Sequence, residues 1–400
     1  MSDSNTITLP RRDEPFGHAL RSHWTLDASV RFLNHGSYGA TPRSVLAAQD
    51  RWRSRLEREP VRFMVDELPQ ALGVAADRLA RFVGACGAGD TKGSKLAFVE
   101  NATAGANAVL RSLHWHAGDR IVIANHAYPA LKNAARFVAD RCGAIVVEAQ
   151  VPWPLPSADA LVSAYTDALR GGARLVIVDH VFSPLAVMTP LAPVLAACRA
   201  AGAQVLVDGA HAPAQLPLVV DDVLFAGADW YVGNCHKWLC APKGAGFLVA
   251  TASGRRDLHP VVISNYFGEG FDAEFGWTGT GDPTARLAVP AAIDFIEALG
   301  AARYRDALRT QAREAADRIA DAWRVTPGAP PDCFAAMVAL PFPVTDAGTR
   351  DNALRWRARL LAEHAIEVPV TPIDGRLWVR ISAQVYNELS DYDALGAVFR

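Results

Sequence analysis

Short apolar runs alternate with longer helical segments between residues 96 and 207 of this 400-residue chain. The expected strands are 96–99, 120–124, 144–148, 174–178 and 204–207, and the expected helices between them are 104–112, 129–142, 157–169 and 191–201. The runs are apolar almost throughout, as in strands that are buried on both faces. Strands joined by helices in this way run parallel, with helices on both faces of the sheet. The sequence therefore predicts an α/β fold, a three-layer sandwich built on a mostly parallel sheet.

A change in pattern near residue 285 indicates a second domain. A long helical stretch at 290–323 is followed by expected strands near 334–338 and 377–381, which flank a helix at 351–364. The first thirty residues are rich in charge, proline and polar side chains, which is typical of an irregular arm. We therefore expect an N-terminal arm at 1–30, a large domain at 31–285 and a smaller α+β C-terminal domain at 286–400, with the N-terminal segment packing on it.

Charge and composition exclude several kinds of partner. The net charge is −2 with both signs evenly mixed, which gives no electrostatic case for nucleic acid or an acidic membrane surface. No segment approaches the ~18 consecutive apolar residues of a spanning helix, and the polar start does not resemble a signal peptide. The six cysteines lack metal-ligand spacing, so we expect them reduced and expect no metal site. These features predict a cytoplasmic protein that acts on a small molecule.

An acid and a lysine at the ends of two successive strands carry the strongest chemical signal. Asp208 ends the apolar run 203–207, and Lys237 ends the run 228–236. Either residue alone is more often a helix cap or a surface cation. Lysine at the mouth of a buried sheet is costly to desolvate unless it is used, and pyridoxal phosphate needs both an acid for its ring nitrogen and a lysine for its aldehyde. The pair therefore predicts a pyridoxal phosphate site.

The junction between the first strand and its helix is suited to a phosphate group. Residues 101–105 (NATAG) stand where backbone N–H groups of a helix start can bind an anion. Ala102 and Thr103 are the candidates, with the Thr103 hydroxyl as a further donor. A simple helix cap at Thr103 would look the same and would not exclude phosphate contact.

Six motifs in order give the chain a resemblance to a known family. They are 32–39 (FLNHGSYG), 101–103 (NAT), 208–211 (DGAH), 233–238 (GNCHKW), 277–282 (WTGTGD) and 379–382 (VRIS). Together they resemble the class V branch of the fold-type-I pyridoxal phosphate enzymes, and within it the isopenicillin N epimerase-like group. The resemblance covers the chain from residue 32 to about 399.

The resemblance implies roles for further residues around the cofactor. His236 is expected to help hold the phosphate, and Thr280 to reach the phosphate of a neighbouring subunit, which implies a homodimer with shared active sites. An aromatic side chain, Tyr128 in preference to His126, is expected to lie on the ring. Ser183, with His180 as its competitor, falls where relatives place a polar group near the ring's phenolic oxygen. His211 is expected beside the ring.

The remaining assignments concern the substrate. Arg380, at the end of an expected strand, suits the α-carboxylate because a guanidinium gives two parallel hydrogen bonds to a planar carboxylate. In this family Asn34, His35 and Tyr38 would line the substrate side. Lys237, Asp208 and His211 are the expected catalytic residues, with Lys237 as the base at Cα.

Family resemblance leaves the reaction open after that proton is removed. The expected route runs through an external aldimine and a quinonoid, from which epimerisation, β-elimination and transamination are all possible. We place an epimerase first, with a C–S β-lyase on a cysteine conjugate or cysteine sulfoxide, or an aminotransferase, as alternatives. No cysteine stands near Arg380, so persulfide transfer of the desulfurase kind is disfavoured.

Two other classes rank last. A non-catalytic pyridoxal phosphate carrier would have no need of Arg380 as a carboxylate clamp. A hydrolase using Ser37 lacks the glycine two places before the serine and the strand–turn–helix context of a nucleophile elbow.

Overall fold

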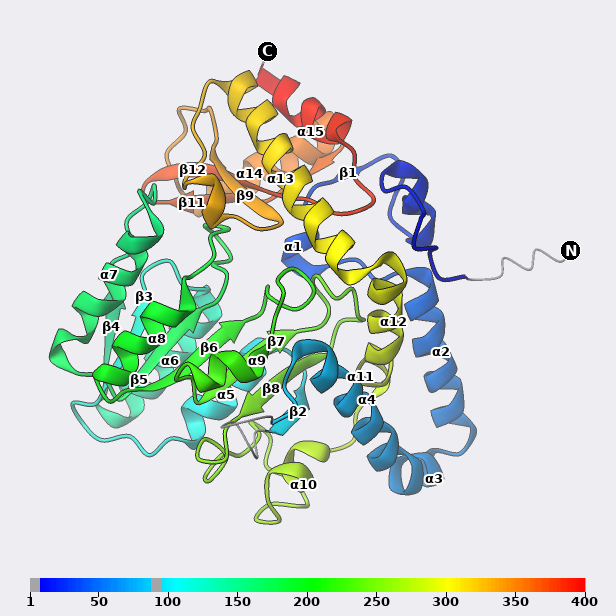
Figure 1. The fold of residues 1–400 in the computed structure, drawn as a ribbon, viewed down its shortest axis with the longest axis vertical. Coiled ribbons are helices and arrows are strands. Elements are labelled where there is room, and N and C mark those ends of the chain that lie inside the picture. Colours follow the sequence, from blue (N-terminus) through cyan, green and yellow to red (C-terminus); the bar gives the residue numbers. More distant parts are fainter. Residues whose placement is uncertain (1–7, 88–94, 400) are drawn as a thin grey trace, which may run out of the picture.

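The structure is a computed structural model that describes residues 8–87 and 95–399. A sheet of seven strands lies at its centre. The sheet order is β2-β8-β7-β6-β5-β3-β4, and only β8 runs antiparallel to its neighbours. Its strands are β2 (Lys95–Val99), β3 (Arg120–Ala124), β4 (Ile145–Ala149), β5 (Leu175–Asp179), β6 (Gln204–Gly209), β7 (Trp230–Asn234) and β8 (Gly246–Ala250). The predicted mostly parallel sheet is confirmed (Figure 1).

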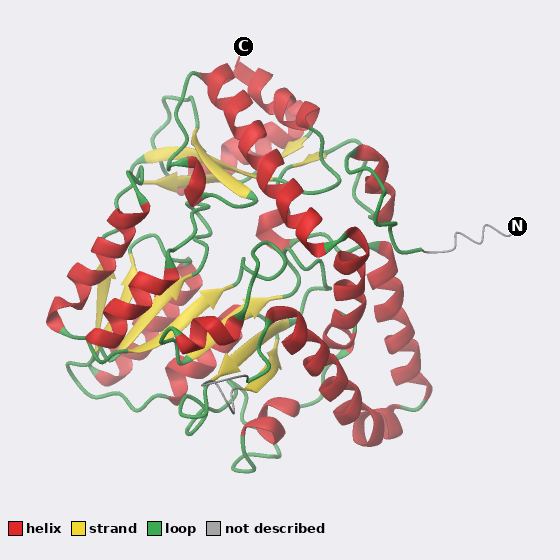
Figure 2. Cartoon of the chain, in the orientation of Figure 1, coloured by secondary structure: helices red, strands yellow, loops and turns green. Residues whose placement is uncertain are grey.

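Helices cover both faces of this sheet (Figure 2). They include α5 (Ala102–Ser112), α6 (Pro129–Cys142), α7 (Ala158–Ala168), α8 (Leu191–Ala200) and α9 (Val220–Phe225), with α5 packed on α6 and α7 on α8. Local sequence accounts for their ends. Asn101 caps α5 by accepting the Ala104 N–H at 2.9 Å, and α6 begins at Pro129 and ends at Gly143, whose φ is 71°.

A smaller antiparallel sheet, β11-β12-β9, forms the core of the C-terminal part. Its strands and helices are β9 (Met337–Pro341), β11 (Val370–Ile373), β12 (Arg376–Ser382), α12 (Val289–Leu299), α13 (Ala301–Trp323), α14 (Arg350–His364) and α15 (Leu389–Gly396). The helix expected at 290–323 is in fact two helices. Gly300 separates them with a φ of 79°, a conformation that an interior helical residue does not adopt.

The N-terminal segment is more ordered than an irregular arm. Residues His18–His23 form a 3₁₀ helix (η1), and Leu20 and Trp24 are buried. The Trp24 ring lies 5.2 Å from that of Phe295 and 4.9 Å from that of Tyr386, measured between centroids. This part of the segment therefore belongs to the core, because two large apolar side chains outweigh its polar composition.

The next stretch of chain contributes one strand of a separate two-stranded sheet. Strand β1 (Arg31–Phe32) pairs in parallel with β10 (Ile366–Glu367), and the remaining helices are α1 (His35–Tyr38), α2 (Arg43–Arg58), α3 (Pro60–Arg62), α4 (Leu68–Val83), α10 (Phe271–Gly276) and α11 (Thr284–Leu287). Figure 1 shows α1 between the central sheet and the C-terminal strands. Within the described part of the chain, no helix is both long and apolar enough to cross a membrane.

Candidate active site

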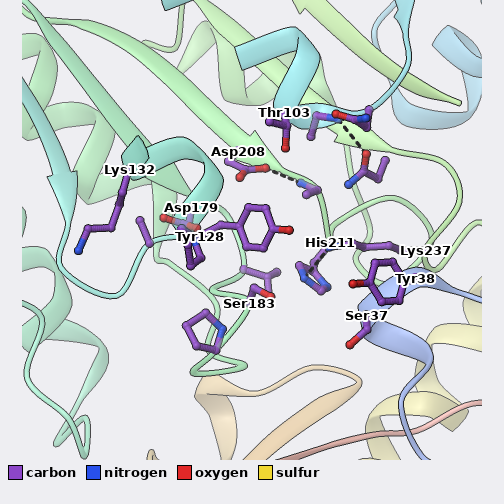
Figure 3. Close-up of a pocket in the computed structure, with 18 of the residues that line it drawn as sticks. Ser37, Tyr38, Thr103, Tyr128, Lys132, Asp179, Ser183, Asp208, His211 and Lys237 are labelled. Carbon is purple, nitrogen blue, oxygen red and sulfur yellow. Dashed lines mark hydrogen bonds between the residues drawn. The ribbon is translucent and has the colours of Figure 1, made fainter. Parts of the chain in front are cut away.

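A cavity of about 890 Å³ lies at the carboxyl ends of β5, β6 and β7, the edge of a parallel sheet where ligands bind. Residues of α1, α5, α6, β11 and β12 complete its wall. It brings together most of the site residues predicted from the sequence: Tyr38, Ala102, Thr103, His126, Tyr128, Ser183, Asp208, His211, His236, Lys237 and Arg380. Figure 3 shows several of them around one space.

Lys237 follows β7 and is buried, with 8% of its surface exposed. Burial and then the positive charge of Arg380 lower its pKa, Asp208 raises it, and the net value is about 7. Near neutral pH a large fraction of this side chain is therefore an uncharged amine. An uncharged amine is the form that can attack an aldehyde or accept a proton.

His211 fixes the orientation of that amine. Its Nε2 lies 2.9 Å from Lys237 Nζ, and its Nδ1 accepts a hydrogen bond from the Trp238 indole N–H at 3.3 Å. Since Trp238 can only donate, His211 Nδ1 must be unprotonated and Nε2 carries the hydrogen in the neutral ring. Burial holds the pKa of His211 well below its usual value, so the ring stays neutral. Lys237 then accepts the hydrogen bond, as a neutral amine can.

Asp208 lies at the end of β6 with its carboxyl group buried. Its Oδ1 accepts the backbone N–H of Ala210 at 2.9 Å, and burial raises its pKa, while the Ala210 N–H and Lys237 counteract this. A second buried acid, Asp179, stands opposite Asp208 in the register of β5 and β6 and also lines the cavity. Sequence reasoning missed Asp179, although the run 174–178 points to an acid at its strand end.

The start of helix α5 forms the end of the cavity that is suited to an anion. Asn234, which sequence reasoning did not single out, accepts the N–H of Ala102 through its Oδ1 at 2.9 Å and so holds the first turn of α5 against β7. Thr103 stands in that turn and lines the cavity. His236 lies beside it with a buried Nδ1 that has no hydrogen-bond partner among the described residues. Lys243, also unpredicted, adds a positive charge to this end.

Tyr128 and His126 occupy different places in the loop between β3 and α6. The Tyr128 ring centroid is 6.0 Å from Lys237 Nζ, and Figure 3 shows the ring at the centre of the cavity. His126 Nε2 is buried, lies 3.6 Å from Asp374 and has no hydrogen-bond partner in the described chain. Of the two, Tyr128 is placed to face a ring held between Asp208 and Lys237.

Arg380 reaches the cavity from β12. Its Nη1 donates to Ser183, at 2.6 Å to the carbonyl oxygen and 3.0 Å to Oγ, and its Nη2 donates to Ser37 Oγ at 2.9 Å. Burial lowers its pKa to about 10, and within the described residues its Nη groups donate to serines and not to a carboxylate. A buried guanidinium without an anionic partner is suited to binding a carboxylate from a ligand. Ser183 therefore contacts the arginine directly.

Three of the residues predicted from the family lie outside the cavity wall. Asn34 donates to Glu367 Oε1 at 2.9 Å, and His35 is fully buried behind Lys237. Thr280 is exposed in the loop after α10. Ser37, considered above only as a hydrolase nucleophile, donates to Asn34 Oδ1 at 2.5 Å and is committed to Arg380 and Asn34.

The donor set fits pyridoxal phosphate. Asp208 offers a buried carboxyl group to a ring nitrogen, Lys237 offers a neutral amine to an aldehyde, and the start of α5 with Thr103 offers donors to a phosphate. The unpartnered Nδ1 of His236 at the phosphate end is the kind of orphaned buried atom that a ligand satisfies. These residues share one cavity and its size accommodates the cofactor together with an amino acid.

Known proteins resemble this chain over nearly its whole length. Residues 42–395 match the family described as aminotransferase class-V. A probable chloroplastic L-cysteine desulfhydrase of Arabidopsis thaliana is 31% identical, covering 99% of this chain and 86% of its own. An isopenicillin N epimerase of Streptomyces clavuligerus is 34% identical, covering 94% and 95%. The structure of a cysteine desulfurase from Thermococcus onnurineus NA1 has the same fold, with a TM-score of 0.79, 19% identity and coverage of 97% and 98%.

Proposed function

This chain belongs to the class V aminotransferase family, and we propose that it is a C–S β-lyase that cleaves the Cβ–S bond of a cysteine-derived amino acid. It is a pyridoxal phosphate-dependent enzyme, which agrees with the resemblance drawn from the sequence. When bound, the cofactor supplies an electron sink for the bond that breaks at Cα.

The residues of the cavity divide the work of binding between them. Asp208 would hold the ring nitrogen, and Ala102, Thr103 and His236 would hold the phosphate. Arg380 would bind the substrate α-carboxylate through its two Nη groups, which fixes the orientation of Cα. The Nζ of Lys237 would then take the proton from Cα, since its low pKa leaves it uncharged near neutral pH.

The observation that carries this proposal is the pairing of the candidate base Lys237 with His211, whose Nε2 lies 2.9 Å from Lys237 Nζ. Elimination needs one base at Cα, whereas epimerisation through two bases needs a second group on the opposite face. Burial raises the pKa of the Tyr128 phenol, so near neutral pH this group stays protonated and is not available as a second base. The geometry therefore favours elimination over the epimerase that the sequence placed first.

The names of similar proteins and the positions of the cysteines both support a lyase. Relatives named L-cysteine desulfhydrases are 30–33% identical to this chain. Persulfide transfer would need a cysteine at the substrate, and none of the six cysteines is among the described residues that line the cavity. Release of the sulfur fragment into solution is therefore the supported outcome.

A second candidate is epimerisation, and Tyr38 is the observation that favours it. This side chain lines the cavity from α1, is 72% exposed and lies close enough to Tyr128 for its charge to affect the pKa of that phenol. In this candidate reaction Tyr38 would be the second acid, supplying a proton to Cα from α1. Relatives named isopenicillin N epimerases, which are 33–34% identical to this chain, also support this candidate.

A homodimer with shared active sites is part of the proposal. Thr280 is exposed and does not line the cavity of its own chain, so it is free to contact another subunit. Exposed apolar side chains of the neighbouring loop, Val262, Ile263 and Phe267, would be covered by such a contact. Light scattering of the purified protein measures its mass, which should be that of a dimer. Mixing inactive Lys237→Ala and Thr280→Ala subunits should restore activity if the sites are shared.

Product analysis in heavy water decides between the reactions. The purified enzyme is incubated with L-cysteine, cysteine conjugates and cysteine sulfoxides, and the products are examined by mass spectrometry and chiral chromatography. Pyruvate, ammonia and a sulfur fragment support the lyase. An intact amino acid with deuterium at Cα and a growing D form contradicts it and supports the epimerase, and a keto acid formed with loss of free aldehyde cofactor would indicate transamination.

A further inference from the structure

Asp179 and Asp208 end adjacent parallel strands and face each other directly in the register of β5 and β6. Both carboxyl groups are buried, with 2% and 3% of the residue surface exposed, and both line the cavity. The Oδ2 atom of Asp179 is buried and has no hydrogen-bond partner in the described part of the chain. An acid placed so close to the cofactor-binding acid is unexpected unless it has a role there.

Two buried carboxyl groups at adjacent strand ends cannot both carry a charge cheaply, because each disfavours ionisation of its neighbour. Burial and the charge of Asp208 both raise the pKa of Asp179 well above its usual value. Asp208, in contrast, is close enough to Lys237 for the lysine charge to lower its pKa, and it accepts the Ala210 N–H. Within residues 8–87 and 95–399, no cation lowers the pKa of Asp179 in this way. The single negative charge of the pair therefore belongs on Asp208.

The other neighbour of Asp179 is Tyr128, the aromatic residue that faces the cavity. The backbone N–H of Tyr128 lowers the pKa of Asp179, so it lies within reach of this carboxyl group. Figure 3 shows Asp179 beside Tyr128, on the side of that ring away from Lys237. Other bonds hold the same loop: Asn125 Oδ1 accepts the Val151 N–H at 3.0 Å, and Lys132 donates to the Asn125 carbonyl at 2.7 Å. Asp179 thus connects the loop that carries Tyr128 to the strand next to Asp208.

We propose that Asp179 is a positioning residue that acts as a neutral carboxylic acid, anchoring the backbone of Tyr128 and leaving the one negative charge of the pair on Asp208 for the cofactor's ring nitrogen. An oxygen of the acid accepts the Tyr128 N–H, and the protonated oxygen adds no charge beside Asp208. The role concerns cofactor binding and holds whichever reaction the enzyme performs.

Three variants separate a neutral acid from a charged one. Asp179→Asn has the same shape as the protonated acid, keeps an oxygen for the Tyr128 N–H and carries no charge. Asp179→Ala leaves that buried N–H without an acceptor. Asp208→Asn removes the charge from the neighbouring position and is the matched control.

Cofactor affinity is measured by titrating each apoenzyme with pyridoxal phosphate and following its absorbance. We expect Asp179→Asn to bind within about threefold of wild type, and Asp179→Ala to bind about tenfold or more weakly because a buried donor is left unsatisfied. Asp208→Asn should lose affinity and change the absorbance spectrum. Equal losses of cofactor affinity in Asp179→Asn and Asp208→Asn would mean that Asp179 must carry a charge. Wild-type affinity in Asp179→Ala would mean that Asp179 does not anchor Tyr128. Either result would overturn the proposal.

Infrared difference spectroscopy of the apoenzyme tests the protonation state without cofactor or turnover. The carbonyl stretch of a protonated carboxylic acid should be present in wild type at neutral pH and absent from Asp179→Asn. Persistence of the full band in Asp179→Asn would contradict the proposal. This measurement also decides the matter if Asp179→Ala does not fold, which circular dichroism and thermal unfolding of the apoenzymes would reveal.

Discussion

The Nε2 atom of His35 lies 3.0 Å from the backbone carbonyl oxygen of Lys237, and its Nδ1 lies 2.8 Å from the hydroxyl of Tyr386. A carbonyl oxygen can only accept, so Nε2 carries the hydrogen and Nδ1 accepts from Tyr386. The first residue of α1 therefore holds the lysine loop from behind and ties it to the C-terminal part of the chain. His35 acts on Lys237 through its main chain rather than on the substrate.

Replacing His35 should destabilise the apoenzyme and loosen the lysine loop. His35→Leu leaves both the Lys237 carbonyl and the Tyr386 hydroxyl unsatisfied in the core, and we expect a loss of about 2 kcal/mol or more in the free energy of unfolding. His35→Gln can donate to one partner and accept from the other, so it should lose less. Urea unfolding of the apoenzymes measures this, and equal stability of His35→Leu and wild type would refute the assignment.

His35 also predicts a loss of stability in acid. Burial lowers its pKa to about 3 from the ordinary value of 6.5. Between these two pH values the unfolded chain binds a proton that the folded chain does not, so stability falls as pH is lowered, by up to about 1.4 kcal/mol per pH unit. Above that window His35 adds nothing to the pH dependence of the free energy of unfolding. We expect the free energy of unfolding of wild type to drop more steeply between pH values of about 6 and about 4 than that of His35→Gln; parallel slopes would argue against it.

The strand–helix alternation was enough to predict the large sheet, because runs such as 174–178 and 204–207 are apolar throughout and only a parallel sheet buries both faces of such strands. The acid and lysine predicted at strand ends line one cavity because the carboxyl ends of parallel strands meet at the same edge of the sheet. Gly300 was overlooked within the long helical pattern, although it splits the helix.

What sequence reasoning could not provide were the contacts between distant segments. Whether His35 faces the cavity or the back of Lys237 depends on packing between residues 200 positions apart in the sequence. The neighbourhood of Asp179 and Asp208 likewise depends on strand register, which the spacing of residues along the chain does not fix. The role of Ser37 could not be predicted from its local motif, because its hydrogen bond to Arg380 joins two ends of the sequence.

Formation of the lysine–cofactor bond should follow the protonation of Lys237. Because its pKa is lowered to about 7, we expect the rate of reconstitution of apoenzyme with pyridoxal phosphate to rise with pH and reach half its plateau near pH 7. Stopped-flow absorbance measures the rate, and borohydride reduction followed by mass spectrometry locates the bond. Lys237→Ala is the control and should show neither signal. A midpoint near the ordinary lysine value of 10.5 would contradict the effect of burial.

Arg380 should matter for the substrate far more than for the cofactor. Arg380→Lys keeps the charge but loses the paired Nη donors, so we expect kcat/KM to fall about 100-fold with the cofactor absorbance unchanged. Ser183→Ala removes one support of the guanidinium at 3.0 Å and should cost about tenfold or less. Steady-state kinetics with substrate and with its decarboxylated amine test this, since the variant should discriminate less between the two. Equal discrimination in wild type and Arg380→Lys would assign the carboxylate to another residue.

Tyr38 offers the test that separates elimination from epimerisation at the level of one atom. Tyr38 is an exposed residue of α1 that lines the cavity, while the amine of Lys237 is held by His211. If elimination is the reaction, Tyr38→Phe should release pyruvate at a rate within about threefold of wild type, because Lys237 alone takes the Cα proton. If Tyr38 is instead a second acid, the same variant would still exchange the Cα hydrogen for deuterium but would stop forming the D amino acid. Lys237→Ala is the control and should lose both signals under either reaction. A Tyr38→Phe variant that binds the cofactor normally but shows neither pyruvate release nor deuterium exchange would contradict both roles and would assign Tyr38 to substrate binding.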